Sequence, residues 1–224
     1  MNKKVILFDI NETVLNLGAL KPIFKETFGS EDALSLWFSK LLHLSTVCIT
    51  TKVKSNFAEL ATIVLDAIAV NYKIQLTEDQ RTELLGAFSN LSPHSDIKPA
   101  LSKLRQHGFK VVALSNSSLN LISMQMKNAE LTDYFDDIIS VEETGSFKPD
   151  PTVYKFAATK LQQPIDQLCL VATHDWDTHG ALSAGLDAAY IDRTGVPYNP
   201  LYLKPKIHST TMGNLVDSII ADQA

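Results

Sequence analysis

Carboxylate, hydroxyl and amine side chains follow the apolar runs of this 224-residue chain in a fixed order. Asp9 and Thr13 come after the first run, Ser115 comes after the second, Lys148 stands in a later loop, and Asp177 closes the set. A carboxylate nucleophile, hydroxyls that bind negative oxygens, a lysine that holds charge and a late acid that handles water are a chemically complete set. The order therefore predicts one site for nucleophilic attack on carbon or phosphorus.

Asp9 stands directly after the apolar residues Val5–Phe8 and before a polar, turn-like segment. The carboxyl ends of parallel strands face the crevice in which doubly wound sheets bind ligands, so a carboxylate there is placed for attack on a substrate. Asp is also a preferred N-cap residue, and a single Asp after a single strand would favour the cap. The ordered set favours the nucleophile. Thr13 and Ser115 keep the same alternative, because hydroxyl groups also cap helices and turns.

Five short apolar runs are bounded by polar or turn residues and separated by longer helical stretches. Continuous apolar runs of this length are typical of strands that are buried on both faces of a parallel sheet. The stretch before Lys110 has apolar residues at helical spacing and stops at Gly108, a common helix terminator. The chain is predicted to be α/β, with a Rossmann-like doubly wound parallel sheet. The predicted strands cover residues 5–8, 110–114, 137–141, 168–171 and 188–191.

Between residues 17 and 91 the pattern changes to two helical stripes, over residues 34–42 and 57–68. Thr77 and Gln80 form a capping box that is predicted to begin a further helix. Because this helical segment interrupts the α/β series after its first strand, it is predicted to be a cap inserted over the site. The predicted domains are a Rossmann-like catalytic core, residues 1–16 and 92–224, and an all-helical cap, residues 17–91.

Composition bounds the partners and the compartment. The chain has 20 basic and 25 acidic residues, a net charge of -5, and no basic cluster to follow a phosphate backbone, so nucleic acid is not an expected partner. A small diffusible molecule is expected instead. Cys48 and Cys169 form no CxxC pair and are predicted to be reduced and buried, which favours the cytoplasm. The first apolar stretch stops at Asp9, too short for a signal peptide or a membrane span, so neither is expected.

The candidate residues lie in short motifs that follow one another along nearly the whole chain: Phe8-Asp9-Ile10-Asn11-Glu12-Thr13, Leu114-Ser115-Asn116-Ser117, Lys148-Pro149-Asp150, Trp176-Asp177 and Arg193-Thr194-Gly195. This ordered set resembles the haloacid dehalogenase superfamily. Trp176-Asp177, Gly180 and the spacing of Lys148 and Tyr154 make the chain most similar to the L-2-haloacid dehalogenase branch. The resemblance implies the α/β fold with a helical cap.

The resemblance also implies a metal-independent hydrolase without a cofactor, whose Asp9 attacks C2 of a short 2-haloacid, expels halide and forms an aspartyl ester. Water activated by Asp177 then hydrolyses the ester. Halide leaves unprotonated, so Asn11 is tolerable where a phosphatase of the superfamily has an acid for the leaving alcohol. Thr13, Ser115 and Lys148 complete the implied catalytic group, and the family likeness favours a homodimer. The implied substrate contacts are Asn11, Lys40, Phe57, Asn116, Tyr154 and Trp176.

Two places depart from the dehalogenase branch. The branch has an arginine just after the cap's tryptophan to receive the halide, whereas this chain has Ser39 and Lys40 there. Lys40 could replace it, although a compact ammonium differs from a planar guanidinium and a solvated lysine is the alternative. In the motif that contains Trp176-Asp177, this chain has Ala172 and His174 where the dehalogenase branch has a serine and an asparagine. His174 is a catalytic candidate, because an ordinary pKa of about 6.5 suits a base that orients or deprotonates water.

Three other interpretations stay open. A magnesium-dependent phosphatase would need ligands from Asp175 and Asp177, because the usual earlier acid of the magnesium site is missing near Ala172-Thr173. A binding protein with the same fold would hold a ligand at Asp9 without turnover. A hydrolase that acts on another activated carbon would agree with the missing arginine.

Overall fold

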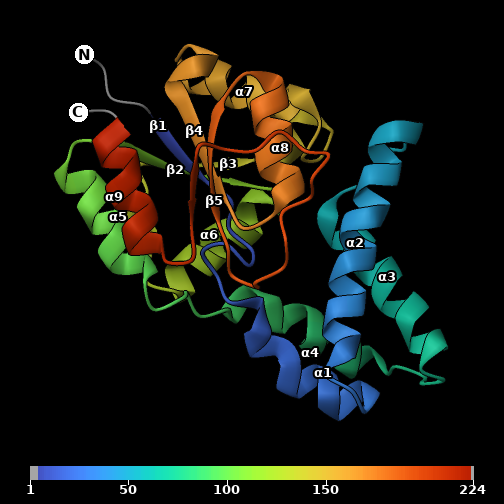
Figure 1. Cartoon of the computed structure of the whole chain (residues 1–224). Coiled ribbons are helices and arrows are strands. Elements are labelled where there is room, and N and C mark those ends of the chain that lie inside the picture. The colour runs from blue at the N-terminus through green and yellow to red at the C-terminus, as the bar shows by residue number, and fades with distance from the viewer. Residues whose placement is uncertain (1–4, 223–224) are drawn as a thin grey trace.

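The computed structural model describes residues 5–222 and contains a parallel sheet with strand order β3-β2-β1-β4-β5-β6 (Figure 1). All five neighbouring pairs in this sheet are parallel. The chain order reverses between β1 and β4, and doubly wound sheets bind ligands at such a switch point. The predicted α/β fold is confirmed. The strands are β1 Val5–Phe8, β2 Lys110–Ser115, β3 Asp137–Ser140, β4 Leu168–Ala172, β5 Asp187–Ile191 and β6 Ile207–Ser209.

Helices cover both faces of the sheet. α5 and α9 contact each other on one face, and α7 and α8 contact each other on the opposite face (Figure 1). Right-handed crossovers between parallel strands produce this division. The helices are α1 Lys21–Phe28, α2 Asp32–Thr51, α3 Phe57–Asn71, α4 Glu78–Ala87, α5 Ile97–Gln106, α6 Leu119–Asn128, α7 Pro151–Leu161, α8 Asp175–Ala184 and α9 Met212–Asp222. Short 3₁₀ segments lie at Leu17–Leu20, Phe88–Asn90, Thr132–Tyr134, Val141–Thr144 and Ile165–Gln167.

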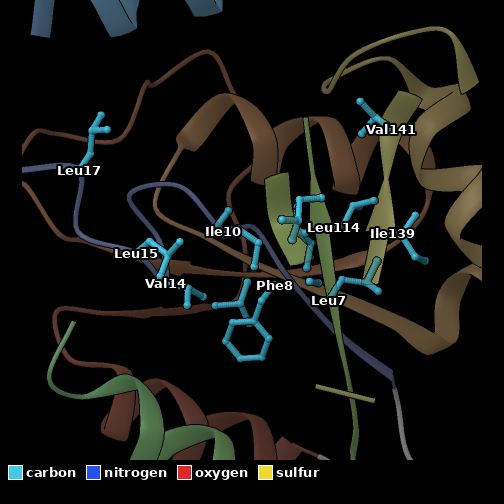
Figure 2. Packing of buried hydrophobic residues seen from close by; sticks show 14 of the residues in the cluster. Leu7, Phe8, Ile10, Val14, Leu15, Leu17, Leu114, Ile139 and Val141 are labelled. Atoms are coloured by element: carbon cyan, nitrogen blue, oxygen red, sulfur yellow. The ribbon is translucent and has the colours of Figure 1, made fainter. Parts of the chain in front are cut away.

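The central strands are apolar on both sides because helices cover both faces of the sheet. β1 is buried at every position, and Leu7, Leu114 and Ile139, from three neighbouring strands, pack beside one another (Figure 2). Ile10 and Val14, in the loop that follows β1, belong to the same buried cluster (Figure 2). Buried apolar side chains therefore anchor the loop that carries Asp9 both before and after its polar residues.

The segment between β1 and α5 is helical throughout, and its helices α1 to α4 lie together at one side of the sheet (Figure 1). α2 and α3 pack along each other, and Trp37 Nε1 donates a hydrogen bond to the Ala61 carbonyl at 3.0 Å. The predicted capping box is present, since the side chains and backbone N–H groups of Thr77 and Gln80 bond reciprocally. An inserted helical cap is therefore confirmed. Its domain boundaries at residues 16 and 91 stay a prediction.

Some details differ from the sequence-based expectations. β3 ends at Ser140, and Val141 begins a 3₁₀ segment instead of closing the strand. β6 follows a proline-rich stretch and has no buried residue, so no apolar run predicts this edge strand. Cys48 and Cys169 are both buried, as expected. Among residues 5–222, α2 alone is long and apolar enough to cross a membrane, and its Trp37 is buried inside the cap.

Candidate active site

Lys148 lies between two carboxylates at the centre of the site. Its Nζ is 2.7 Å from Asp9 Oδ1 and 2.6 Å from Asp177 Oδ2, and it also donates to the Leu114 carbonyl at 3.2 Å. The exposed fraction is 5% for Asp9, 1% for Lys148 and 0% for Asp177. Asp9 follows β1, Lys148 precedes α7, and Asp177 lies in the first turn of α8. The carboxyl edge of the sheet therefore brings three predicted site residues together.

The three charges determine one another's protonation. Burial alone would raise the pKa of the Asp9 carboxyl, but Lys148 and His174 outweigh burial and lower that pKa. Burial would lower the pKa of Lys148, but the charges of Asp177 and Asp9 raise it. Burial, together with the Asp9 charge, raises the pKa of Asp177 against the opposing effect of Lys148. An ionised nucleophile beside a carboxyl group with a raised pKa suits covalent catalysis followed by hydrolysis.

Thr13 orients Asp9. Its Oγ1 donates to Asp9 Oδ2 at 2.7 Å and accepts from the Thr173 N–H at 2.9 Å. Because the oxygen accepts a backbone N–H, the hydroxyl proton is left for the carboxylate. Arg193 donates to the Thr13 carbonyl at 3.2 Å, and the same guanidinium pairs with both oxygens of Asp96 at 2.8 and 2.9 Å. The closing Arg-Thr-Gly motif therefore fixes the loop that follows β1.

Tyr154 fixes the second carboxylate. Its hydroxyl donates to Asp177 Oδ1 at 2.6 Å, and its side chain is fully buried. Gly180 leaves the space that this ring needs, since a Cβ at position 180 would lie 2.7 Å from Tyr154 Oη and 2.5 Å from the Cβ of Pro149. The packing between α7 and α8 therefore requires a residue without a side chain at position 180.

His174 carries a positive charge in the site. Its Nε2 lies 2.8 Å from Glu12 Oε2, and its Nδ1 lies 3.4 Å from Asp9 Oδ2. Burial would lower the pKa of His174, but Asp9 and Glu12 raise it to about 10. Trp176, a predicted substrate contact, is half-buried and stacks on the imidazole with ring centroids 5.1 Å apart. An imidazolium cannot accept a proton from water at neutral pH, so this pKa favours orientation of the water over its deprotonation, and the catalytic role of His174 stays a prediction.

Asn11 belongs to a buried amide network beside the nucleophile. Its Nδ2 donates to Ser117 Oγ at 3.2 Å, and its Oδ1 accepts from Gln125 Nε2 at 3.3 Å. Gln125 Nε2 also donates to the Phe88 carbonyl of the cap at 2.8 Å. Asn11 is therefore held at the junction of cap and core, two residues from Asp9.

Ser115 and Asn116 lie at the end of β2, and each accepts a backbone hydrogen bond. Ser115 Oγ accepts from the Ser117 N–H at 3.2 Å, and Asn116 Oδ1 accepts from the Lys148 N–H at 2.9 Å. Both bonds use the side-chain oxygen, so the hydroxyl proton of Ser115 and the amide protons of Asn116 remain available to a ligand. Their roles in catalysis and substrate binding stay predictions.

An apolar cavity of about 110 Å³ lies between the cap and the core. Phe57 forms part of its wall, and Ser117 forms part of its opposite, core side. Lys40 does not line this cavity, and its role as a substrate contact stays a prediction. The side chain of Lys40 is exposed, because Lys40 lies outside the buried stripe of α2 that Trp37 and Leu41 form.

A family model described as haloacid dehalogenase-like hydrolase matches residues 3–185. The chain belongs to the haloacid dehalogenase-like hydrolases. It is 29% identical over 196 residues to (S)-2-haloacid dehalogenase 1 of Pseudomonas sp. (strain CBS-3), over 87% of this chain and 86% of the relative. It is 28% identical over 210 residues to (S)-2-haloacid dehalogenase 4A of Burkholderia cepacia, over 92% and 91% of the two chains.

The fold is also that of a solved dehalogenase. The L-2-haloacid dehalogenase from Xanthobacter autotrophicus, with chloropropionic acid covalently bound, superposes with a TM-score of 0.91 at 20% identity. The match covers 97% of this chain and 98% of that one. At this identity the likeness establishes a shared fold.

Haloacid dehalogenase-like hydrolases include magnesium-dependent enzymes, and the residues of this member do not fit that ion. The Lys148 ammonium fills the position between Asp9 and Asp177 in which a divalent cation would need both carboxylates. The carboxylate of Asp175, the alternative ligand, instead accepts hydrogen bonds from the backbone N–H groups of Trp176, at 2.7 Å, and Asn199, at 3.1 Å. Within residues 5–222, no group of three or more His, Cys, Asp or Glu side chains could hold a metal ion.

Glu12, Ser117 and Gln125 belong to this hydrolase site and are absent from the sequence-based candidates. Glu12 and Ser117 lie inside the motifs that contain Asp9 and Ser115, but those motifs alone do not show which side chains Glu12 and Ser117 contact. Gln125 lies inside α6, and the chain order alone cannot show that its side chain reaches Asn11.

Gly180→Ala is expected to reduce both the stability and the turnover of this hydrolase. The added methyl group must displace Tyr154 or Pro149, at a cost of about 1–3 kcal/mol in the free energy of unfolding. The shift of Tyr154 would misplace Asp177. Thermal unfolding and steady-state kinetics measure both effects. Gly213→Ala in α9 is the matched control, since a Cβ there meets nothing within 4 Å, and identical behaviour of the two variants would contradict the close packing at position 180.

Proposed function

We propose that this chain is a 2-haloacid dehalogenase, which hydrolyses the carbon–halogen bond of short 2-haloacids without a metal through an ester on Asp9. The observation that carries the proposal is the buried Lys148 ammonium, which contacts both Asp9 and Asp177. It keeps the nucleophile ionised and takes the place that a divalent cation would need. The similarity to the (S)-2-haloacid dehalogenases of Pseudomonas sp. and Burkholderia cepacia supports the same reaction class.

In the first step, an Asp9 oxygen forms a bond to C2 of the haloacid, and the carbon–halogen bond breaks with its electron pair on the halide. Halide needs no proton, so no general acid is required. Asn11 stands two residues after the nucleophile and is bonded to Ser117 and Gln125. An amide cannot protonate a leaving alkoxide, so the site favours a carbon–halogen bond over a phosphomonoester.

In the second step, water adds to the carbonyl carbon of the Asp9 ester and gives a proton to Asp177. The bond between that carbon and the ester oxygen then breaks, and the departing 2-hydroxyacid takes the proton back from Asp177. The regenerated Asp9 carboxyl loses the second proton of the water to solvent, because its pKa is lowered. Burial raises the pKa of Asp177 and so makes it a better proton acceptor than an exposed aspartate. Tyr154 and Lys148 hold its two oxygens in place for this exchange.

The substrate class is a small organic acid with a short apolar chain. The hydroxyl of Ser115 and the amide of Asn116 are the donors proposed for the substrate carboxylate, and the cavity beside Phe57 is the place proposed for the chain. The cap gives the site no arginine, since Arg81, the first arginine in the sequence, pairs with Asp66 at 2.9 Å on the surface of the cap. A different activated carbon compound is the second candidate that this difference favours.

The decisive experiment compares halide release with phosphate release. Purified enzyme in chelator is expected to release chloride from L-2-chloropropionate, and the rate should not change when magnesium is added. Phosphomonoesters should give no phosphate under either condition. Failure of the folded enzyme to release halide from any short 2-haloacid would rule out the dehalogenase proposal, and phosphate release that chelator abolishes would establish a phosphatase.

Asp177→Asn is expected to trap the ester on Asp9 and to slow turnover by roughly 10³-fold, because the variant lacks the base for water. Intact mass spectrometry after exposure to L-2-chloropropionate should find the protein heavier by the bound acyl group. Asp175→Asn is the matched control from the same turn, since the carboxylate of Asp175 accepts only backbone N–H bonds, and it should accumulate no adduct. Rapid turnover by Asp177→Asn would remove Asp177 from the water step.

A further inference from the structure

Glu12 and His174 form an ion pair beside the nucleophile that the two steps above do not use. Glu12 Oε2 holds His174 Nε2 at 2.8 Å, and the imidazole also contacts Trp176 and Phe38, with ring centroids 5.1 and 6.2 Å away. His174 Nδ1 is consequently directed toward Asp9 Oδ2 at 3.4 Å. This Nδ1 is buried and makes no well-aligned hydrogen bond, so a donor stands ready beside the reacting carboxylate.

The backbone of Glu12 indicates that its side chain is needed. Its φ of 66° lies in the left-handed region, which glycine adopts at less cost than any other residue. The Glu12 N–H donates to the Leu15 carbonyl at 2.9 Å, and the Glu12 carbonyl accepts from His94 Nε2 at 2.9 Å. A non-glycine residue held in an unfavourable conformation at a site points to a function of its side chain, here the contact with His174.

The two oxygens of Asp9 have different surroundings. Oδ1 accepts from Lys148, whereas Oδ2 accepts from Thr13 and also faces His174. A carboxylate oxygen has two lone pairs. Oδ1 uses one lone pair for Lys148 and keeps the other free for attack, whereas both lone pairs of Oδ2 face donors, Thr13 and His174. Oδ1 therefore becomes the ester oxygen, and Oδ2 becomes the carbonyl oxygen of the ester.

We propose that His174, positioned by Glu12, donates from Nδ1 to Asp9 Oδ2 and stabilises the oxyanion that forms there when water attacks the ester. This role rests on the proposed function, because it requires the ester. Thr13 supplies the second donor. When water adds to Cγ, the carbonyl bond opens and Oδ2 takes the negative charge. When the carbonyl bond forms again, the Cγ–Oδ1 bond breaks and Oδ1 leaves with the 2-hydroxyacid.

The proposal explains how a histidine serves a hydrolytic site without acting as its base. A charged donor that is fixed before the reaction stabilises a developing oxyanion more than solvent does. Because His174 acts as a cation, ester hydrolysis should be lost as the pH rises through its pKa. In the free enzyme Asp9 and Glu12 together raise this pKa to about 10. In the ester Asp9 is neutral and only Glu12 raises the pKa, so the loss should come at a lower pH than the free-enzyme titration. The titratable groups that face it directly are Asp9 and Glu12, with Lys148 on the far side of Asp9 and His94 on the backbone of Glu12.

The test separates the two chemical steps in Glu12→Gln, Glu12→Gly and His174→Gln. Rapid quenching should find the chloride burst nearly unchanged and the decay of the ester slowed by about 10²-fold in His174→Gln, with smaller slowing in both Glu12 variants. Glu12→Gln keeps the size of the side chain and removes its charge. Glu12→Gly removes the carboxylate and relieves the backbone, so part of the stability lost with the ion pair is recovered. Slower ester decay at a temperature at which thermal unfolding shows this variant to be folded therefore cannot come from misfolding.

A second measurement does not depend on turnover. The imidazole signals of His174, followed by NMR in the free enzyme, should titrate far above the ordinary value in the wild type and about one to three pH units lower in Glu12→Gln. Titration near 6.5 in the wild type, or unaltered ester decay in all three variants with an intact burst, overturns the role of His174 alone. A wild-type enzyme that releases no chloride would instead remove the proposed function, and the oxyanion role with it.

Discussion

Asp9→Asn is expected to abolish halide release, with a loss in kcat on the order of 10⁴-fold or more. The neutral amide lacks the anionic lone pair that must attack C2, and no other carboxylate lies in its place. Asp177 cannot substitute, because the Lys148 ammonium lies between its carboxylate and the position of the Asp9 carboxylate. Chloride release measures the loss, and intact mass spectrometry should find no ester in the variant.

The variant should remain folded, which makes the loss interpretable. Without the Asp9 charge, Lys148 still has Asp177 and His174 still has Glu12, so neither cation is left buried without a partner. Thermal unfolding and ligand binding are the controls. A folded Asp9→Asn protein that binds 2-haloacids without turnover is the expected result, whereas continued halide release would show that water or another residue is the nucleophile. A wild-type protein that binds but never turns over would support the binding-protein interpretation.

Most of the fold could be predicted from the sequence because the strands that form its centre are buried on both faces. A run such as Val5–Phe8 must be apolar throughout, and the run itself therefore reveals the strand. The capping box at Thr77 is equally local, since it depends on residues three positions apart. β6 is not predictable in this way, because an edge strand with exposed residues needs no apolar run. The cytoplasmic location and the homodimer stay predictions.

The site could be predicted as far as it follows the ends of strands. Asp9, Lys148 and Asp177 converge because the sheet places the carboxyl ends of its strands at one edge. The roles of Lys40 and His174 are harder to predict, because they depend on three-dimensional neighbours. Whether a lysine beside a helical stripe faces the site depends on how the helix is rotated. The protonation of His174 depends on the two carboxylates around it, which no motif reveals.

Lys148→Met is expected to destabilise the protein by about 3–5 kcal/mol and to abolish turnover. Methionine fills a similar volume, but the variant leaves Asp177 buried with no opposite charge and leaves Asp9 with His174 alone. The nucleophile would also lose one of the two cations that lower its pKa, so a smaller fraction would be ionised. Denaturant unfolding gives the change in stability, and chloride release gives the change in activity.

The pH dependence of stability should reverse in this variant. In the wild type the pKa of Asp9 is lowered, so its contribution to stability is present above an unfolded-state pKa of about 3.9 and lost as the pH falls. In Lys148→Met the uncompensated Asp177 has a pKa well above that value. A raised carboxyl pKa stabilises the folded state at low pH and loses this effect as the pH rises. The variant should therefore gain stability as the pH falls through the raised pKa of Asp177, because this carboxyl then becomes protonated.

The double variant Lys148→Met/Asp177→Asn separates charge from chemistry. It removes the buried carboxylate that lacks a partner, so it should recover much of the stability lost in Lys148→Met while turnover remains absent. The amide oxygen that replaces the carboxylate at position 177 can still accept from the Tyr154 hydroxyl, which keeps the local packing. A double variant as unstable as Lys148→Met would mean that the lysine stabilises the fold by packing rather than by its charge. The proposal of an ammonium that holds two carboxylates together would then fail at its centre.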